Sequence, residues 1–529
     1  MVKLIFSGKL RIILSVFLVT ILFGILYKLY IPRINAFGCF DDCFNIVGGY
    51  FILGGKTLYK DLFFNHQPGM AMLSAIIQAA THPDSIPELI LRHRQVIILI
   101  SFLATLVITL RFGLFFILFS IFYELTKFYV FGDRFLAEGI VGYLLIYQLG
   151  ATLEKILTKK TNRFDVILVP FFAYAVIFLR EPFILVTLFI STIYVLVPPK
   201  LSKNQRRTYA LTFLIPFIIT IASIYLPGYY FNMVTVNKII LNSEAQGQPL
   251  PIRLLKSLLY PLYLLFGSES WNYFRTITAG FSAIFIAASI AFLKIYKKPL
   301  ALLFLIGALA LSNLRPPSAD QTFYESFHIA PWYALLIFSI IFIVKTIYLK
   351  SKKIALAFVV FILLFGVYII SDLRYFGYEK TDLQNEFFTN YSTVMGRGTI
   401  IRDLSDNKST LFLDDYDDLV YFEAKLTPNY KYSWYTSFMN QVPEYIEARE
   451  EMFRNYPPDF YYGDCKGGQG VIPPYIKNNY LEVYEGENVT CIHVSKKRIE
   501  RFSEKQKELT ETIYSLREST KAANLKTTN

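Results

Sequence analysis

Long apolar runs recur along this chain from Phe6 to Ile370, and they limit the folds that it can adopt. They have about 17–25 residues, the length that a helix needs to cross a hydrocarbon core roughly 30 Å thick. Charged residues make up 18% of the chain, fewer than the roughly 25% of a typical soluble protein. No Ala-x-Ala-type cleavage site follows the first run, so we interpret it as a retained helix rather than a signal peptide. The sequence therefore predicts a polytopic membrane protein with an all-α transmembrane domain.

Eleven membrane spans are predicted from these runs, and together they make residues 1–371 one transmembrane domain. The spans are placed at about 12–31, 93–110, 112–130, 136–153, 166–179, 183–198, 208–226, 276–293, 299–312, 330–344 and 354–371. Two further apolar segments, 69–80 and 254–267, are short. We expect both to lie at the outer surface of the bilayer.

The net charge of +13 is unevenly distributed over this topology. With the N-terminus in the cytoplasm, the short inner segments hold 19 Lys and Arg against two acidic residues. The outer connections hold 12 basic and 11 acidic residues. An excess of basic residues on the cytoplasmic side is the usual asymmetry of membrane proteins, and it sets the orientation. The basic charge is thus explained by a lipid bilayer and not by nucleic acid, and the predicted location is the plasma membrane.

The composition changes after about Ser371, where the apolar runs stop and charges become frequent. An odd number of spans puts this tail on the extracytoplasmic side. Residues 372–494 are predicted to form a small α/β domain: 409–426 is typical of a strand, a turn and a helix, 443–462 of a helix and a strand, and 480–495 of a hairpin. Residues 495–529 form a charged tail, either an amphipathic helix on lipid headgroups or a solvated segment.

All four cysteines fall on the outer side in this topology. Their even number in an oxidising compartment favours disulfides, which we expect between Cys465 and Cys491 and between Cys39 and Cys43. A C-x-x-x-C metal site is the alternative for the second pair.

The connection between the first two spans, 32–92, is much longer than a usual connection, and long loops on a rigid scaffold tend to carry function. Asp41 and Asp42 lie near the point where the first span leaves the bilayer. A carboxylate near hydrocarbon is partly desolvated, which raises its proton affinity unless a cation offsets the effect. The two aspartates could therefore do chemistry, or they could cap a helix that begins at Cys43.

The rest of this loop is similar to a known family. Asp41–Asp42, Gly54–Gly55, Tyr59-Lys60-Asp61 and His66-Gln67-Pro68-Gly69 follow one another. This order resembles the first outer loop of the C-superfamily (GT-C) membrane glycosyltransferases, in the family 39 branch of protein O-mannosyltransferases and lipid A aminoarabinose transferases. The chain departs from the common pattern with Asp in place of Glu at 42 and with Gln-Pro-Gly in place of Pro-Pro.

Weaker similarities continue along the chain. Arg92 and Arg94 match an arginine-led second span, Asp133 or Glu138 matches an acidic residue before the fourth span, and Arg180 matches a basic residue before a proline. The loop 313–333 adds Arg315 and His328 among aromatic residues that could stack on a sugar or only belong to the interface belt.

The resemblance implies a hexosyltransferase of the mannosyltransferase type, which transfers a sugar from a polyprenyl-phosphate donor to a hydroxyl acceptor with inversion. The acceptor could be a protein, a glycan or a lipid of the cell envelope. Asp41, with Asp42 beside it, would be the general base. The implied residues for the donor phosphate or substrate are Lys60, His66, Arg92, Arg94, Arg180, Arg315 and His328.

Asp133 and Glu138 would give acidic support. With the two loop aspartates they could also hold a divalent cation, Mg²⁺ or Mn²⁺, although the reaction could equally need none. For each arginine the alternative is snorkelling to the interface without a ligand.

Two other classes of protein remain open. A transporter of lipid-linked glycans would show inverted repeats and charges in mid-span, whereas the charges here cluster at the outer ends of the spans. A non-catalytic membrane assembly protein would have no need of an aspartate beside a group of cations.

Overall fold

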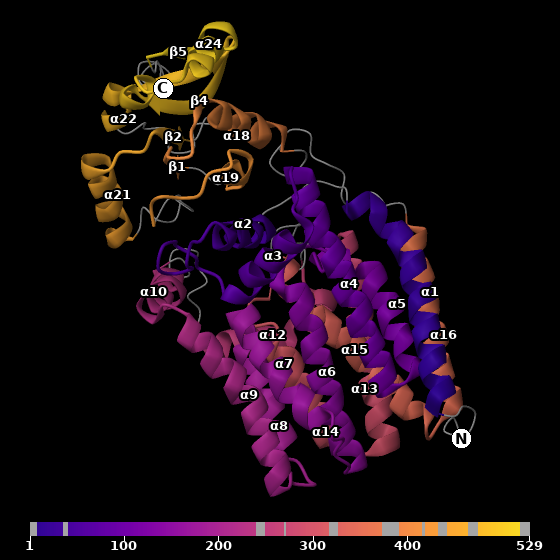
Figure 1. The fold of residues 1–529 in the computed structure, drawn as a ribbon. Coiled ribbons are helices and arrows are strands. Elements are labelled where there is room, and N and C mark those ends of the chain that lie inside the picture. The colour runs from indigo at the N-terminus through magenta and orange to yellow at the C-terminus, as the bar shows by residue number, and fades with distance from the viewer. Residues whose placement is uncertain are drawn as a thin grey trace.

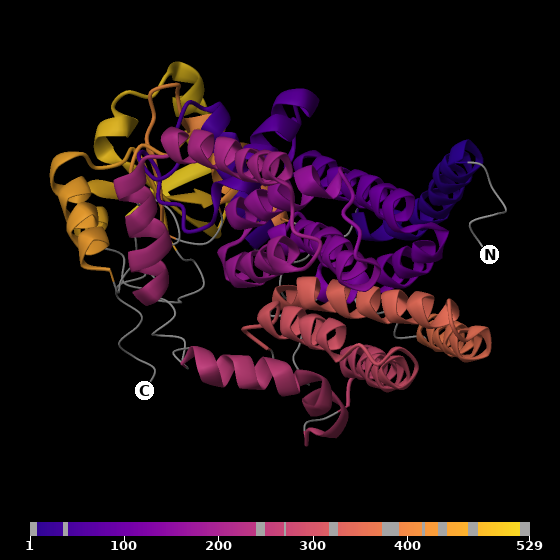
Figure 2. The same cartoon turned by 90° about the horizontal axis from the view of Figure 1, so that it is seen from below.

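The computed structural model shows a helical bundle with a small sheet domain beyond one end of it (Figure 1). The structure describes residues 8–34, 41–239, 249–268, 271–316, 326–372, 391–414, 418–431, 442–463 and 474–518. In the view from below, the helices of residues 250–371 run in a row beside the helices of the first half of the chain (Figure 2).

Within these ranges, six helices are long and apolar enough to cross a membrane, or seven if one bent pair is a single span. The six are α1 (Gly8–Ile34), α4 (Ile86–Phe112), α6 (Ala137–Thr158), α13 (Tyr273–Tyr296), α15 (Ala330–Tyr348) and α16 (Lys352–Ser371). The bent pair is α9 (Lys203–Ser223) with the segment from Leu226 to Ile239, which turn by 99°.

Each of the eleven predicted spans overlaps a helix, but four of these helices are short. They are α5 (Ile117–Thr126), α7 (Asp165–Leu179), α8 (Ile184–Leu196) and α14 (Pro299–Leu311). At about 1.5 Å per residue, a helix of this length does not cover the roughly 30 Å of a hydrocarbon core by itself. The helical membrane domain is confirmed, whereas the count of eleven crossings is not.

Helix α15 lies at the centre of the bundle. Its apolar segment is 94% buried, and it packs against α6, α13 and α16. In α1 and α16, by contrast, only 22% of the apolar segment is buried. Leu, Ile and Phe side chains exposed on these two outer helices are what a lipid-facing surface requires. The burial of each helix therefore separates the core of the bundle from its lipid-facing rim.

Three helical segments lie between the bundle and the sheet domain (Figure 1). They are α2 (Asp41–Leu53), α3 (Pro68–Thr81) and α10 (Leu226–Tyr230), which continues into the π-helix η5 (Phe231–Val236). Helices α2 and α3 approach so closely that a Cβ on Gly49 would lie 2.4 Å from the Ser74 hydroxyl. The 69–80 segment, predicted to lie at the outer surface, corresponds to α3.

The outer domain is built on a five-stranded sheet in the order β1-β2-β4-β3-β5. Its strands are β1 (Leu411–Asp414), β2 (Phe460–Gly463), β3 (Tyr480–Glu485), β4 (Asn488–Ser495) and β5 (Tyr514–Arg517). Only β1 and β2 pair in parallel, with Leu411 opposite Phe460. The helices α18 (Ser392–Leu404), α19 (Leu419–Glu423), α21 (Pro443–Asn455) and α22 (Pro474–Asn479) surround it.

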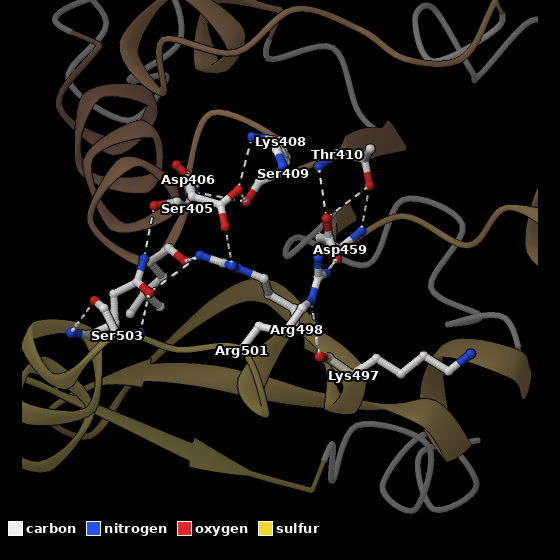
Figure 3. A network of polar contacts seen from close by, with 12 residues as sticks. Ser405, Asp406, Lys408, Ser409, Thr410, Asp459, Lys497, Arg498, Arg501 and Ser503 are labelled. Carbon is white, nitrogen blue, oxygen red and sulfur yellow. Dashed lines mark hydrogen bonds and ion pairs between the residues drawn. The ribbon is translucent and has the colours of Figure 1, made fainter.

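The sheet extends past residue 494, where the sequence places the end of the domain. The segment after it forms α23 (Lys496–Ile499), α24 (Glu504–Thr512) and β5, which pairs with β3. Buried Arg498 links the segment 496–517 to the end of α18. Its side chain contacts Asp406 and donates to the Leu404 carbonyl at 3.1 Å (Figure 3). Arg501 contacts Asp459 nearby, but its side chain is 52% exposed.

The outer domain packs directly on the first outer loop. Tyr421 of α19 meets the ring of Phe51 of α2, and the Phe63 amide donates to the Lys431 carbonyl at 2.7 Å. Phe63 also shares a buried apolar cluster with Val236 of η5 and with Val442 and Tyr445 of the outer domain. The loop before α3 is thus held between η5 and the outer domain.

Candidate active site

Five charged or ionisable side chains meet at the end of the bundle nearest the sheet domain: Asp41, His66, Glu138, Arg180 and His328. The first four line a small recess of about 200 Å³, together with Asn45, Met70 and apolar groups of α6 and α7. The five come from five different parts of the chain, so only the fold brings them together.

Local structure explains each position. Asp41 is the first described residue of α2, Glu138 the second residue of α6, and Arg180 the C-cap of α7. His328 lies in the short η6 (Ser326–Ile329) that leads into α15. The amino-terminal ends of helices carry partial positive charge, so α2 and α6 favour carboxylates at their first turns.

His66 reaches the recess because α3 starts very close to the end of α7. A Cβ on Gly69 would lie 2.6 Å from the Phe178 carbonyl oxygen, so only glycine allows this approach. The departure from the family's Pro-Pro therefore has a packing reason at residue 69. The Tyr59 hydroxyl donates to the His66 carbonyl at 2.8 Å, and His66 Nδ1 lies 3.4 Å from the Asn45 amide oxygen.

The ionic contacts form a chain from Glu138 to Asp41. Arg180 Nε donates to Glu138 Oε1 at 2.7 Å, and Arg180 Nη2 lies 3.8 Å from Asp41 Oδ2. His66 Nε2 lies 3.9 Å from the same Asp41 oxygen, and His328 Nδ1 lies 3.8 Å from Glu138 Oε1. Glu138 thus fixes the guanidinium, whose other end faces Asp41 without a close hydrogen bond.

The surroundings of Asp41 and His66 shift the pKa values of both side chains. Burial raises the pKa of the Asp41 carboxyl above its ordinary value, although Arg180 and His328 oppose the rise. Burial and the Arg180 cation hold the pKa of His66 well below its ordinary value. His66 is therefore neutral at physiological pH and acts through hydrogen bonds, not as a cation.

A second, larger recess of about 760 Å³ adjoins the first. It is lined by His328, Glu181, Pro182, Phe183, Leu185, Leu250, Arg253, Ser312, Leu314 and Arg315. Leu250 and Arg253 belong to α12 (Leu250–Phe266), which corresponds to the second interfacial segment predicted. His328 connects the two recesses, because it lines the larger one and contacts Glu138 of the smaller.

Five of the predicted residues lie elsewhere. Asp42 is fully buried and does not line either recess. Lys60 is exposed in the turn after α2, and Arg92 pairs with Glu88 on its own helix. Buried Arg94 donates to the Ile34 carbonyl at the end of α1, and Asp133 is buried outside both recesses. Their predicted roles in binding or catalysis have no support from these positions.

The positioning residues of α10 and of the π-helix η5 have no counterpart in the sequence prediction. Asn232 is fully buried, accepts the Phe64 amide proton at 2.8 Å and donates to the Gly228 carbonyl. Gln67 and the Tyr229 hydroxyl share hydrogen bonds of 3.0 and 3.1 Å. These contacts hold the peptide on both sides of His66.

The proposed metal ligands do not assemble into one site. In the described part of the chain, no group of three or more His, Cys, Asp or Glu could hold a metal ion. The groups nearest to Asp41 are Arg180 and His66, and Asp133 does not line the recess. A divalent cation therefore does not fit these residues, and we derive no step through one.

Two of the four cysteines are described, and both Cys43 and Cys491 are in disulfide bonds. Cys39 and Cys465, their predicted partners, lie outside the described residues. The pairing itself stays a prediction.

Comparisons with known proteins identify the fold. No family model and no curated protein matches this sequence. Among solved structures, the chain is similar to apo ArnT from Cupriavidus metallidurans, with a TM-score of 0.52 and 11% identity over 90% of this chain and 97% of that one. ArnT bound to undecaprenyl phosphate is similar at a TM-score of 0.50 and 10% identity, over 91% and 97%. The likeness shows that this chain has a fold similar to that of ArnT over about nine-tenths of its length, in agreement with the resemblance that the first outer loop carries.

Proposed function

We propose that this protein is an integral membrane glycosyltransferase that moves a sugar from a polyprenyl phosphate to a hydroxyl acceptor on the extracytoplasmic face. The observation that carries the proposal is Asp41 facing Arg180 in a recess at the outer end of the bundle. A carboxylate and a fixed cation are the two groups that such a transfer needs.

Asp41 is the proposed general base. It accepts the proton of the acceptor hydroxyl while the hydroxyl oxygen bonds to the anomeric carbon and the bond from that carbon to the phosphate oxygen breaks. Attack from the face opposite the leaving group inverts the anomeric carbon. The raised pKa of Asp41 supports this role, because a more basic carboxylate is a better proton acceptor.

Arg180 is the proposed partner of the departing phosphate. Its planar guanidinium suits phosphate oxygens, and its bond to Glu138 fixes its orientation before the donor binds. Snorkelling does not explain its position, because the side chain is 9% exposed and lies against two carboxylates. Arg315 and Arg253 in the adjoining recess extend the positive surface.

Neutral His66 completes the proposed site. With Asn45 on one ring nitrogen and Asp41 near the other, it can hold the acceptor hydroxyl or steady the carboxylate. The structural neighbour bound to undecaprenyl phosphate supports a lipid of that class as the donor carrier. A mannosyl or related hexosyl donor is the one that we propose to test first.

The deciding experiment measures sugar transfer in membranes from an undecaprenyl-phosphate hexose to hydroxyl acceptors. We expect transfer by the wild type and its loss in Asp41→Asn with normal insertion. A wild type that transfers nothing but moves lipid-linked glycans across the bilayer would favour a transporter. A wild type with neither activity would favour an assembly protein.

A further inference from the structure

The larger recess is lined by two polar side chains that each bury one atom without a hydrogen-bond partner in the described part of the chain. Glu181 Oε2 and Arg253 Nε are both buried and have no hydrogen-bond partner among the described residues.

Such a concentration of unsatisfied groups is costly. A buried polar atom without a partner loses its hydration and gains nothing in exchange, so native proteins keep few of them. Here one carboxylate and one guanidinium line a single recess. Together they supply acceptors and donors to whatever fills it.

The chemistry of the wall selects among possible occupants. A bare phosphate would suit Arg253 and Arg315, but it cannot donate to the Glu181 carboxylate and carries the same sign of charge. A purely apolar chain would suit Phe183 and Leu185 and leave the Glu181 and Arg253 side chains without partners. A sugar fits both kinds of surface, because its hydroxyls donate and accept hydrogen bonds and its C–H face is apolar.

The position of the recess also suits the sugar of the donor. Glu181 follows Arg180 in the chain, so neighbouring residues face the two recesses. His328 lines the larger recess and lies 3.8 Å from Glu138, which holds Arg180. A sugar in the larger recess would therefore have its phosphate bond near Arg180.

We propose that the larger recess is the sugar subsite of the donor and that Glu181 is its specificity-determining residue, accepting a hydrogen bond from one sugar hydroxyl. This inference rests on the proposed function. A site built to hydrogen-bond a hydroxyl discriminates strongly against ligands that lack it, since the polar groups then stay unpaired. The hydroxyl that Glu181 accepts would thus set which monosaccharide is transferred.

The experiment compares binding of lipids with and without a sugar. The purified full chain in nanodiscs is titrated with undecaprenyl phosphate and with its mannosyl, glucosyl, galactosyl and N-acetylglucosaminyl forms. We expect the wild type to prefer at least one sugar-bearing lipid over the bare lipid. Glu181→Ala should reduce that preference by roughly 10- to 100-fold, the change in affinity that the loss of a hydrogen bond to a charged group produces. Glu181→Gln keeps an acceptor oxygen and should lose less than about 10-fold.

The controls separate this inference from the proposed function. Glu181→Ala should still bind undecaprenyl phosphate, which shows that the variant is folded. Glu500→Ala removes an exposed carboxylate of the outer domain and should leave every ratio unchanged.

Each contrary result has a distinct meaning. A wild type that binds none of the lipids overturns the proposed function and this inference with it. A wild type that binds all forms equally, or a preference that survives in Glu181→Ala, overturns the inference alone. Equal losses in Glu181→Gln and Glu181→Ala overturn the hydroxyl assignment, because the glutamine amide oxygen can still accept a hydrogen bond from that hydroxyl.

Discussion

At the residue scale, Asp41 and Asp42 are neighbours in sequence but not in environment. The Asp41 side chain is 35% exposed and faces Arg180 across the recess, whereas Asp42 is fully buried within the first turn of α2. A carboxylate that must meet an acceptor hydroxyl needs access. The structure therefore gives a physical reason to assign the base to Asp41 and a supporting role to Asp42.

Asp41→Asn should lower turnover by at least the roughly 10²–10⁴-fold that a positioned acid–base group contributes. The amide keeps the size of the side chain but cannot take the proton. The measurement is the rate of sugar transfer in membranes with matched protein levels. Asp42→Asn serves as the neighbouring control and should act on stability or substrate binding more than on kcat. Equal and mild losses in both variants would leave only the helix-cap interpretation.

The pH dependence of transfer should report the raised pKa of Asp41. Activity requires the ionised carboxylate, so it falls as the pH drops through this pKa, and a raised pKa places that acid limb above the ordinary value of about 3.9. Arg180 lowers the pKa, so Arg180→Gln should move the limb to higher pH as well as slow the reaction. The measurement is kcat/KM from about pH 4 to pH 8. An acid limb that does not move in Arg180→Gln would show that another group titrates.

At the element scale, short-range patterns predict most of the secondary structure of the outer domain. The strand, turn and helix of 409–426 correspond to β1 and α19, and the hairpin of 480–495 corresponds to β3 and β4. The last strand, β5, is not predicted by such a pattern. The spacing of Leu509, Ile513 and Leu516 fits one face of a single helix, and it fits a helix followed by a strand equally well. Only the pairing with β3 decides between the two.

Long-range contacts explain what the sequence cannot predict about the site. The first outer loop carries a recognisable motif, so Asp41 and His66 could be found from the sequence. Asn232 lies 168 residues from the Phe64 amide that it holds, and no local pattern marks such a pair. The arginines show the same limit. Their positions at the ends of spans predict their depth in the membrane but not what each side chain contacts. Arg180 lines the small recess, whereas Arg94 donates to a carbonyl at the end of α1.

Arg498 and Arg501 form a matched pair for testing what fastens the last elements to the outer domain. Arg498→Met should destabilise β4 and its neighbours by about 1–3 kcal/mol, because the buried Leu404 carbonyl and Asp406 lose their donor. Arg501→Met should cost less than about 1 kcal/mol, since its side chain is half exposed to solvent. Hydrogen exchange of the β4 amides in the full chain measures both. Equal effects would mean that the burial of Arg498 does not decide the stability.

At the scale of the whole molecule, the fold agrees with the predicted orientation in one visible respect. Helix α1 begins at the end of the bundle farthest from the sheet domain (Figure 1). An N-terminus in the cytoplasm would thus place the sheet domain and the recesses outside, where the charge distribution also puts them. Orientation relative to the membrane itself stays a prediction.

A cysteine-labelling scan with a membrane-impermeant reagent tests this orientation in intact cells. Lys60→Cys in the first outer loop and Lys477→Cys in α22 should react, whereas Lys203→Cys at the start of α9 should be protected until the cells are permeabilised. The native Cys43 and Cys491 are in disulfides and give a low background. Labelling of Lys203→Cys with protection of Lys477→Cys would reverse the topology and the face on which the reaction occurs.

The loop that presents His66 is held between η5 and the outer domain, through the Phe63 amide and its apolar contacts with Val442 and Tyr445. The two domains therefore do not form a modular pair. A chain cut after Ser371 would keep every residue of the recess, yet it would lose one of the two walls that shape the loop. Any effort to reduce this protein to a minimal catalytic unit, or to exchange its outer domain with that of a relative, has to carry the matching loop along with the domain.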